Sequence, residues 1–413
     1  MATAANNPPT YSEPTFLNEQ EPFTDTGNGE RLAVNHAQHL RYVPQWGWLY
    51  YATGAWRRDV DSTFVAEQAK ATLRQMAAAH LGNGTKADQD NWHRHIRYSF
   101  NNVEKMVRSA RTVKDVAAKL DAFDTDPWQF NCANGVLNLK TGAFEPHDPA
   151  LLLAKQSPVS YDPTATCPTW QRFLTEIFCE RPDLIRWVQK ALGYSLTGST
   201  REQVFFVCYG GGWNGKSVLR ELIAYILGDY AKPLKADALM DNPYRNGSGA
   251  DPELAALVGA RYVSAAEPRE RGRDKAPVLD TGRVKELTGG DTLQVRELYG
   301  MPFSFQPQFK LWLSVNNRPE VPENTLGIWR RIRLVPFEAN FEGRADQELP
   351  DKLRPEAPGI LNWLLAGCRL WQQEGLGALP QAVREATREY HEHEDEYAPF
   401  FDEVLCRDGT PGA

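Results

Sequence analysis

The sequence predicts an α/β fold, and two observations carry this prediction. In the second half of the chain, apolar runs of strand length alternate with segments of helical periodicity, as at 204–209 and 217–227. Between these two segments, residues 210–217 read Gly-Gly-Gly-Trp-Asn-Gly-Lys-Ser. Strand, glycine-rich loop and helix in this order are typical of a phosphate-binding loop, so we expect an α/β domain built around it.

The remaining elements are predicted in order along the chain. Residues 1–22 form a polar tail that we expect to be disordered, and 23–155 have the mixed pattern of an α+β domain. Within that domain we predict two strands around a turn at 46–56, helices at 65–81 and 92–120, and a strand pair at 130–147. A linker and helical region follows at 156–196, the nucleotide-binding domain at 197–345, and a C-terminal helical segment at 346–413.

The composition excludes several classes of protein. A formal net charge of −7 excludes a generally basic, DNA-coating protein, although Lys and Arg can still gather in one channel. The six cysteines contain no Cys-x-x-Cys pair, which argues against zinc ribbons and disulfide frameworks. Neither a signal peptide nor an apolar run of about 20 residues is present, so we expect a cytoplasmic protein.

The glycine-rich loop predicts binding of a nucleoside triphosphate. Its glycines let backbone N–H groups converge on phosphate oxygens, and the helix N-terminus adds partial positive charge. Lys216 would reach the β- and γ-phosphates, and the Ser217 hydroxyl would ligate Mg²⁺. The residues expected to bind the nucleotide are Gly210, Gly211, Gly212, Trp213, Asn214, Gly215, Lys216, Ser217 and Val218.

Two later strands end in polar side chains that could complete a hydrolytic site. Residues 261–266 form a short apolar strand that ends in Glu267, where a carboxylate can orient the attacking water and help to hold Mg²⁺. Residues 309–315 form another, which ends in Asn316, whose amide could bind the γ-phosphate or the water. Taken singly, Glu267 could equally be a surface residue, and Asn316 a turn residue before a proline.

Two further groups of residues are candidates for roles between subunits and on a polymer. Arg330 and Arg331 precede a strand and could act as an arginine finger on a neighbouring subunit, or could simply be solvated. Residues 284–309 predict a projecting β-hairpin that turns at about Tyr299-Gly300. Lys285 and Arg296 flank it and could contact phosphates or form local salt bridges, and Tyr299 could stack on a base.

The order of these motifs resembles the motif set of superfamily 3 helicases. The set comprises the glycine-rich loop, the strand-end Glu, the hairpin introduced by Lys-x-x-Thr-Gly-Gly-Asp, the strand-end Asn and Trp-Arg-Arg. More narrowly, the chain resembles the helicase part of phage, plasmid and poxvirus primase–helicases from about Phe23 to its C-terminus. The segments at 23–28 and 133–139 contribute to this resemblance.

The resemblance implies an AAA+-type core with a mixed α/β N-terminal domain and a helical collar, assembled as a hexameric ring with ATP and Mg²⁺ between subunits. It implies an ATP-driven replicative DNA helicase in which Glu267 is the catalytic carboxylate, Asn316 senses the γ-phosphate and one of the two arginines acts in trans. The hairpin, with Lys285, Arg296, Tyr299 and Gly300, would line a central channel. Single-stranded or forked DNA, primase and origin-binding proteins are the implied partners, in the bacterial host of a phage, plasmid or mobile element.

Three departures from the family pattern are visible. Ala266 stands where many relatives have a second acid, no primase module precedes residue 23, and the chain stops where relatives usually begin a winged-helix domain. Another AAA+ motor, such as a duplex-DNA translocase or a protein remodeller, is an alternative reading. So is an assembly module whose nucleotide only holds a ring together.

Overall fold

A computed structural model describes residues 24–79, 86, 90, 94, 95, 97, 99–242, 251–267, 276–298 and 300–394. The predicted N-terminal tail, Tyr299 and the C-terminal residues where a winged-helix domain was expected to be absent lie outside these described residues. The chain divides into two compact units, of which unit 1 is Met1–Thr125 with Pro146–Lys155 and unit 2 is Asp126–Glu145 with Gln156–Ala413. Residues 126–145, which the sequence boundaries put in the N-terminal domain, therefore belong to unit 2. No helix in the described ranges is long and apolar enough to cross a membrane.

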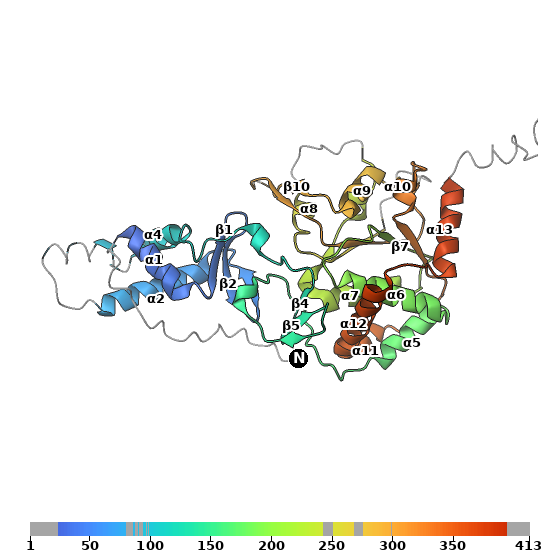
Figure 1. Ribbon diagram of the computed structural model, residues 1–413, viewed down its shortest axis with the longest axis horizontal. Helices are drawn as coiled ribbons and strands as arrows, with labels where there is room; N and C mark the ends of the chain where they lie inside the picture. Colours follow the sequence, from blue (N-terminus) through green and yellow to red (C-terminus); the bar gives the residue numbers. More distant parts are fainter. Residues whose placement is uncertain are drawn as a thin grey trace, which may run out of the picture. The chain divides into compact units, whose positions relative to one another are not determined.

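In its described residues, unit 1 combines a small antiparallel sheet with the helices α1, α2 and α4 (Figure 1). Its elements are α1 (Asp25–His36), β1 (Leu40–Val43), β2 (Gly47–Ala52), β3 (Ala55–Arg58), α2 (Thr63–Ala79) and α4 (Phe100–Ala110). The predicted strand pair at 46–56 is confirmed as β2 and β3, and β1 pairs with the other side of β2. Leu32, Trp48, Leu73 and Met106 are buried in one core, so all three helices pack on the same apolar cluster.

The predicted helix at 92–120 is wrong in its second half. The helix α4 ends at Ala110, and the backbone of Tyr42 then donates to the carbonyl of Val116 and accepts from the N–H of Ala118. The chain after α4 therefore extends along β1, because these long-range backbone bonds replace those that a continuing helix would supply.

Unit 2 is built on a five-stranded sheet in which every neighbouring pair is parallel. The strand order is β13-β7-β12-β9-β8. These strands are β7 (Phe205–Tyr209), β8 (Ala231–Pro233), β9 (Tyr262–Ala266), β12 (Lys310–Val315) and β13 (Ile332–Pro336). The predicted α/β class and its three apolar strands at 204–209, 261–266 and 309–315 are confirmed, and β7 lies between strands on both sides.

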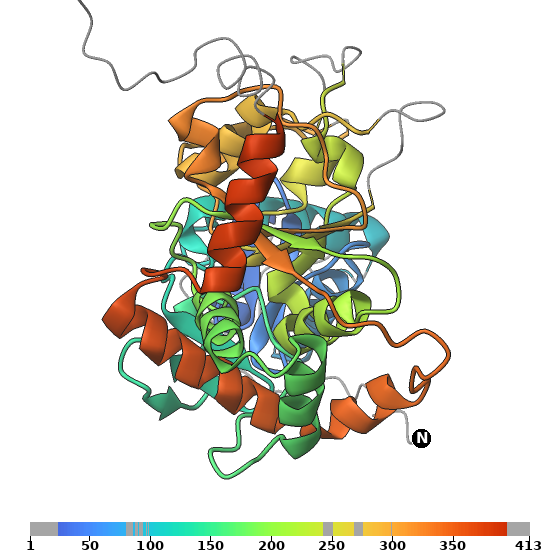
Figure 2. The same cartoon turned by 90° about the vertical axis from the view of Figure 1, so that its right-hand side faces the viewer.

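Helices cover both faces of this sheet (Figures 1 and 2). In Figure 1, α6, α7 and α12 lie below it and α9 and α10 above, while α13 runs beside β13. The bounds are α5 (Pro168–Ile177), α6 (Pro182–Ser195), α7 (Lys216–Leu227), α8 (Pro252–Ala255), α9 (Thr281–Gly289), α10 (Leu326–Trp329), α11 (Leu349–Leu353), α12 (Ala357–Glu374) and α13 (Gln381–Glu394). Phe206 and Trp312 stack at 4.1 Å between ring centroids, and they face the same core as α6, α7 and α12.

Two features of unit 2 differ from the predicted elements. The helix expected at 170–196 is broken into α5 and α6, because Cys179 and Glu180 adopt left-handed backbone angles just before Pro182. The strand pair expected at 130–147 is a three-stranded antiparallel sheet of β4 (Gln129–Cys132), β5 (Gly135–Asn138) and β6 (Phe144–Glu145). The buried Arg261 guanidinium donates to the carbonyl of Gln129, which ties this small sheet to the start of β9.

A short hairpin projects from unit 2 after α9. Its strands are β10 (Leu293–Val295) and β11 (Phe303–Phe305), and Leu293 pairs with Phe305 and Val295 with Phe303. The hairpin predicted from residues 284–309 is therefore present. Leu298 and Met301, at 64% and 80% exposure, lie in its turn.

Candidate functional site

The glycine-rich loop connects the carboxyl end of β7 to the first turn of α7, as predicted. Two of its glycines are required by their surroundings. A Cβ on Gly210 (φ +155°) would lie 2.2 Å from the carbonyl oxygen of Phe337, and one on Gly215 (φ +85°) would lie 2.5 Å from a methyl carbon of Ile177. The loop therefore keeps its shape only with glycine at both positions.

Lys216 is held inside this loop. Its ammonium donates to the carbonyl oxygens of Gly210 and Gly211, at 2.5 and 2.9 Å, and to Oδ1 of Asn316 at 3.2 Å. Desolvation by burial lowers the pKa of Lys216, an effect that the nearby Cys208 and Glu267 oppose. The Asn214 amide donates to the Gly211 carbonyl at 2.6 Å and so braces the loop from inside. A cation fixed in a loop of backbone groups is suited to binding the phosphates of a nucleotide.

The register of the parallel sheet brings three polar groups to one edge. Val315 of β12 lies opposite Tyr209 of β7, and Ser314 lies opposite Ala266 of β9, so these strands end side by side. Asn316 and Glu267, the next residues on their strands, meet there, and the Asn316 amide donates to Oε1 of Glu267 at 3.3 Å. Lys216, Asn316 and Glu267 therefore form one continuous hydrogen-bonded chain.

Glu267 leaves its strand in an unusual backbone conformation. Its φ of +49° is left-handed, which costs about 1–3 kcal/mol in a residue other than glycine. Its N–H donates to the carbonyl of Ser314 at 3.0 Å, which holds the turn in place. Strain of this kind persists where surrounding structure fixes the residue, and here it aims the carboxylate at Asn316.

A cavity of about 650 Å³ opens beside this chain. It is lined by Gly211, Gly212, Trp213, Asn214, Gly215, Lys216, Ser217 and Val218, together with Glu267 and Asn316. Of the nine residues predicted to bind the nucleotide, Gly210 alone does not line it. The predicted phosphate loop, carboxylate and amide thus face one hollow.

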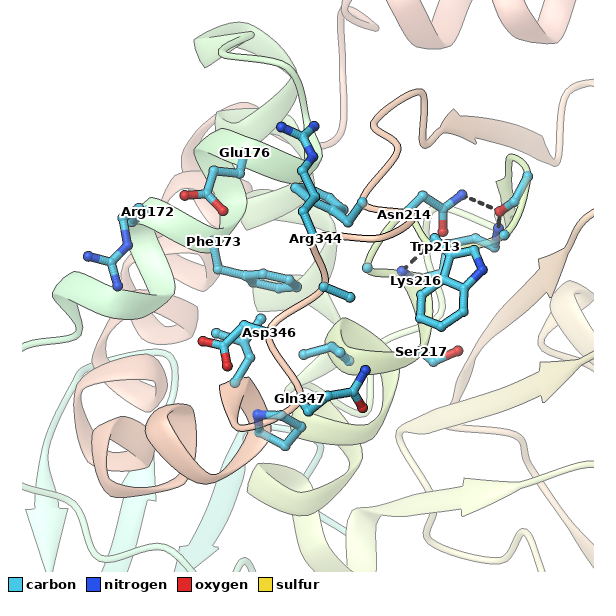
Figure 3. Close-up of a pocket in the computed structure, with 18 of the residues that line it drawn as sticks. Arg172, Phe173, Glu176, Trp213, Asn214, Lys216, Ser217, Arg344, Asp346 and Gln347 are labelled. Carbon is cyan, nitrogen blue, oxygen red and sulfur yellow. Dashed lines mark hydrogen bonds between the residues drawn. The ribbon is translucent and has the colours of Figure 1, made fainter.

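The other end of the cavity was missed by sequence reasoning. Figure 3 shows Phe173 of α5 pointing toward the glycine-rich loop across the hollow, and residues 341–350 supply a further wall. Arg172, Phe173 and Glu176 come from α5, and Arg344, Asp346 and Gln347 from the later segment. The backbone N–H of Phe341 donates to the Trp213 carbonyl at 2.7 Å, which attaches that segment to the loop. This end of the cavity therefore combines an aromatic ring with charged and polar side chains.

The donors for a magnesium ion fit the chemistry that Mg²⁺ requires. The Ser217 hydroxyl and the Glu267 carboxylate both line the cavity, and Mg²⁺ takes oxygen ligands while keeping waters and substrate phosphates in its shell. In the part of the chain that the structure describes, no group of three or more His, Cys, Asp or Glu residues could hold a metal.

Arg330 and Arg331 lie at the opposite edge of the sheet from their own cavity. The N–H of Phe205, the first residue of β7, donates to the carbonyl of Arg331. Gly210 of the phosphate loop lies five residues farther along this strand, so the Arg331 backbone is about 16 Å from the loop. Arg331 is 8% exposed and its guanidinium donates to the Thr288 hydroxyl and the Gly327 carbonyl. Arg330 is exposed and donates to the Gln203 amide oxygen at 2.7 Å. Neither arginine joins the cluster at Lys216.

The cations proposed to contact a polymer have differing surroundings. Lys285 forms an ion pair with Glu323, at 2.7 Å from Nζ to Oε2, which realises the salt-bridge alternative although outside the hairpin itself. Arg296 is exposed just beyond β10, and its carbonyl accepts from the N–H of Asp251. Gly300 lies in the hairpin turn, and Tyr299 lies outside the described residues. Arg296 is therefore an exposed cation next to the hairpin turn.

Comparisons with known proteins show to which sequences and structures this chain is similar. Residues 29–179 match the family described as D5 N terminal like. The chain is 32% identical over 308 residues to “Putative helicase L207/L206” of Acanthamoeba polyphaga mimivirus, an alignment that covers 69% of this chain and 31% of that protein. It is 30% identical over 236 residues to “Putative helicase 022R” of Frog virus 3, covering 52% and 23%. A protein of African swine fever virus named “Putative primase” is 25% identical over 246 residues, covering 57% and 24%.

These relatives are longer than this chain, which spans between 23% and 31% of their length. They come from large DNA viruses, whereas the sequence led us to expect a phage, plasmid or mobile element in a bacterial host.

Among solved structures, the apo structure of the NrS-1 C terminal region (305–718) superposes with a TM-score of 0.55 and 14% identity, covering 89% of this chain and 75% of that one. At this identity the likeness is one of fold. The viral relatives and the family match rest on sequence, and the family match at residues 29–179 lies before the glycine-rich loop. The chain therefore belongs to the primase–helicase family, as its motifs indicated.

Proposed function

We propose that this chain is an AAA+-type, ATP-dependent replicative DNA helicase that forms a hexameric ring and translocates on single-stranded DNA. The observation that carries the proposal is the hydrogen-bonded chain from Lys216 through Asn316 to Glu267, on the wall of a cavity large enough for a nucleotide. These are the groups that hydrolysis of a triphosphate needs, namely a phosphate-binding cation, a sensor of the γ-phosphate and a carboxylate that orients water.

Hydrolysis in this site would be an in-line displacement. A water oxygen held by Glu267 attacks the γ-phosphorus, the bond from that phosphorus to the β–γ bridging oxygen breaks, and ADP leaves with that oxygen. The carboxylate of Glu267 takes up the water proton, and Lys216 offsets the charge on the phosphoryl oxygens. A magnesium ion at Ser217 and Glu267 would add positive charge to the β- and γ-phosphates.

The two exposed features away from the cavity support a ring. Arg330 is exposed at the end of the sheet opposite the phosphate loop, so it would serve hydrolysis on the nucleotide of a neighbouring copy. The hairpin β10–β11 presents exposed Leu298 and Met301 with Arg296 beside them, and such a hairpin could follow a strand threaded through a channel. Lys285 is a weaker candidate for DNA contact because Glu323 already neutralises it.

The test is strand displacement. The purified chain is given ATP and a forked duplex with one labelled strand, and ATP turnover is measured with and without single-stranded DNA. We expect DNA-stimulated turnover and ATP-dependent displacement, with a mass in solution of several copies when nucleotide is present.

Each alternative has its own outcome in this experiment. ATP turnover that DNA does not stimulate, without displacement, would point to a protein remodeller. Turnover stimulated by duplex DNA without displacement would point to a translocase. A ring that assembles on nucleotide but never hydrolyses it would be an assembly module.

A further inference from the structure

Unit 1 contains a second hollow, which the proposed ATPase does not use. It has a volume of about 930 Å³ and lies between α2 and α4. The helix α4 supplies much of its wall. Phe100, Val103, Val107 and Arg111 are spaced three or four residues apart, as neighbours on a helix surface are, and Glu104, Lys105 and Arg108 also line it. The groove is therefore formed mainly by residues of α4.

The lining changes character along this face. Val103 and Val107, with Ala66 of α2, form an apolar floor. At one end stands Phe100, whose side chain is 75% exposed even though a hydrophobic residue of this size gains by burial. Ser99 caps the helix by accepting from the N–H of Asn102, so Phe100 is fixed at the first position of α4. An exposed aromatic ring on a fixed backbone is a ready surface for stacking.

The rim of the groove is basic. Its lining contains four cations (Lys70, Lys105, Arg108 and Arg111) and two acids (Asp61 and Glu104), in a chain whose net charge is −7. Arg108 is exposed and makes no ion pair with any residue that the structure describes, and the Arg111 guanidinium lies 5.1 Å from the centre of the Tyr42 ring, without a carboxylate partner there. Lys70 pairs with Glu67 and Lys105 with Asp25, so Arg108 and Arg111 are the lining cations without a carboxylate partner among the described residues.

We propose that this groove binds single-stranded DNA, with a base stacked on Phe100 and the phosphates contacted by Arg108 and Arg111. A positively charged groove with an aromatic platform is the combination by which proteins hold single strands regardless of sequence. An acidic amphipathic helix would be the competing occupant, but it needs a row of apolar pockets, and the floor here has only three small or medium side chains. The proposal rests on the proposed function in one respect, that DNA is the polymer on which this protein acts.

The experiment measures DNA binding by the full chain without nucleotide. A fluorescein-labelled oligothymidine of about 15 nucleotides is titrated by anisotropy over a range of salt concentrations. We expect Arg108→Ala/Arg111→Ala to weaken binding about tenfold or more and to reduce the slope of log K against log salt by about 1.4, since each lost phosphate contact removes about 0.7. Phe100→Ala should weaken binding about tenfold with an unchanged slope, and Phe100→Tyr should restore it.

A matched control removes the same charge from nearby. Lys114→Ala/Lys119→Ala takes away two exposed cations of the same unit that do not line the groove, and it should change affinity by less than about threefold. Groove variants that bind the oligonucleotide like the wild type would overturn the proposal and favour an acidic protein segment as the occupant. So would a wild-type chain that does not bind it at all.

The failure of this proposal is distinguishable from failure of the proposed helicase. ATP turnover without DNA is measured on the same variants, and it should be unchanged because the groove lies in the other unit. A chain that binds DNA through the groove but never hydrolyses ATP would contradict the helicase and support the groove. A chain that hydrolyses ATP with wild-type DNA binding in every groove variant would do the reverse.

Discussion

The two edges of the parallel sheet in unit 2 hold their charged side chains in different ways. At the carboxyl edge, Lys216, Asn316 and Glu267 come from three different elements and join one hydrogen-bonded chain beside a cavity. At the amino edge, Arg331 is buried against Thr288, and Arg330 is exposed and bonded to Gln203. At the carboxyl edge, the ends of β7, β9 and β12 lie side by side, so the polar residues that follow them meet in one site. At the amino edge, each arginine is bonded to a different partner.

The difference assigns distinct kinds of work to the two edges. In the proposed ATPase, groups at the carboxyl edge would face the phosphates, so changing one of them should alter binding or chemistry in its own subunit. Groups at the amino edge would affect hydrolysis through a neighbouring copy, or affect folding.

The largest effect is expected for Lys216→Ala. Removing the ammonium takes away the cation that would contact the phosphates, so ATP turnover should fall to background and nucleotide affinity should drop by about 100-fold or more. Turnover is followed by phosphate release and affinity by a fluorescent nucleotide. Lys235→Ala, at an exposed residue paired with Glu253 and away from the cavity, is the control and should behave like the wild type. Turnover that survives in Lys216→Ala would place the chemistry elsewhere.

Arg330 and Arg331 test the amino edge, and the structure separates their expected effects. Arg330→Ala removes an exposed side chain, so stability should change by less than about 0.5 kcal/mol, while turnover should fall about 1,000-fold if this arginine acts in trans. Arg331→Ala removes a buried guanidinium that donates to the Thr288 hydroxyl and the Gly327 carbonyl, and it should destabilise unit 2 by about 1–3 kcal/mol, measured by urea unfolding.

A mixing experiment decides whether the action is in trans. Neither Arg330→Ala nor Lys216→Ala should turn over ATP alone, but a mixture creates interfaces in which an intact Lys216 meets an intact Arg330. Part of the activity should then return. A mixture that stays inactive, with rings formed, would show that Arg330 is not the finger, and the same mixture with Arg331→Ala tests the second candidate.

The carboxyl edge was largely predictable from the sequence, because each of its groups is fixed by local pattern. A strand of five or six apolar residues has a visible end, so Glu267 and Asn316 could be placed at strand ends, and the glycine-rich loop carries its own signature. The register that brings them together is set by the pairing of β12 with β7 and β9, which no single segment encodes.

The amino edge and the far wall of the cavity could not be predicted, because their partners are distant along the chain. The Arg331 guanidinium meets Thr288, 43 residues away, and nothing near Arg331 shows that it would be buried. The far wall combines Phe173 of α5 with Gln347, residues that the sequence put in separate regions. The helix predicted to run to residue 120 failed for a similar reason, since Val116 bonds instead to Tyr42 on β1.

Glu267→Gln sharpens the account of the carboxyl edge with a smaller expected loss. Glutamine keeps an oxygen that can accept from the Asn316 amide, but it cannot take up a proton from water, so turnover should fall about 100-fold while nucleotide affinity stays within about threefold. Glu176→Gln, at the far end of the same cavity, is the control and should leave turnover at saturating ATP near that of the wild type. Equal losses in the two variants would mean that the cavity, and not the position of Glu267, sets the rate.

The smallest expected effect concerns the Lys285–Glu323 pair, which decides whether Lys285 serves structure or a polymer. Hydrogen bonds from Lys285 and Thr325 lower the pKa of Glu323 to about 2, from an ordinary value near 4.5. Because the folded pKa is depressed, the stability it contributes is complete above about pH 4.5 and is lost as the pH falls toward 2. Both side chains are partly exposed, so we expect Glu323→Gln to lower the free energy of unfolding by no more than about 1 kcal/mol at pH 7. The difference between the variant and the wild type should become smaller near pH 3.

Urea unfolding at pH 7, 5 and 3 measures this difference. The control is Glu389→Gln, at an exposed acid that pairs with no described residue. A Glu323→Gln variant that loses no stability but changes affinity for single-stranded DNA would indicate that Lys285 contacts DNA. An ion pair that does not stabilise the fold can exchange its carboxylate for a phosphate.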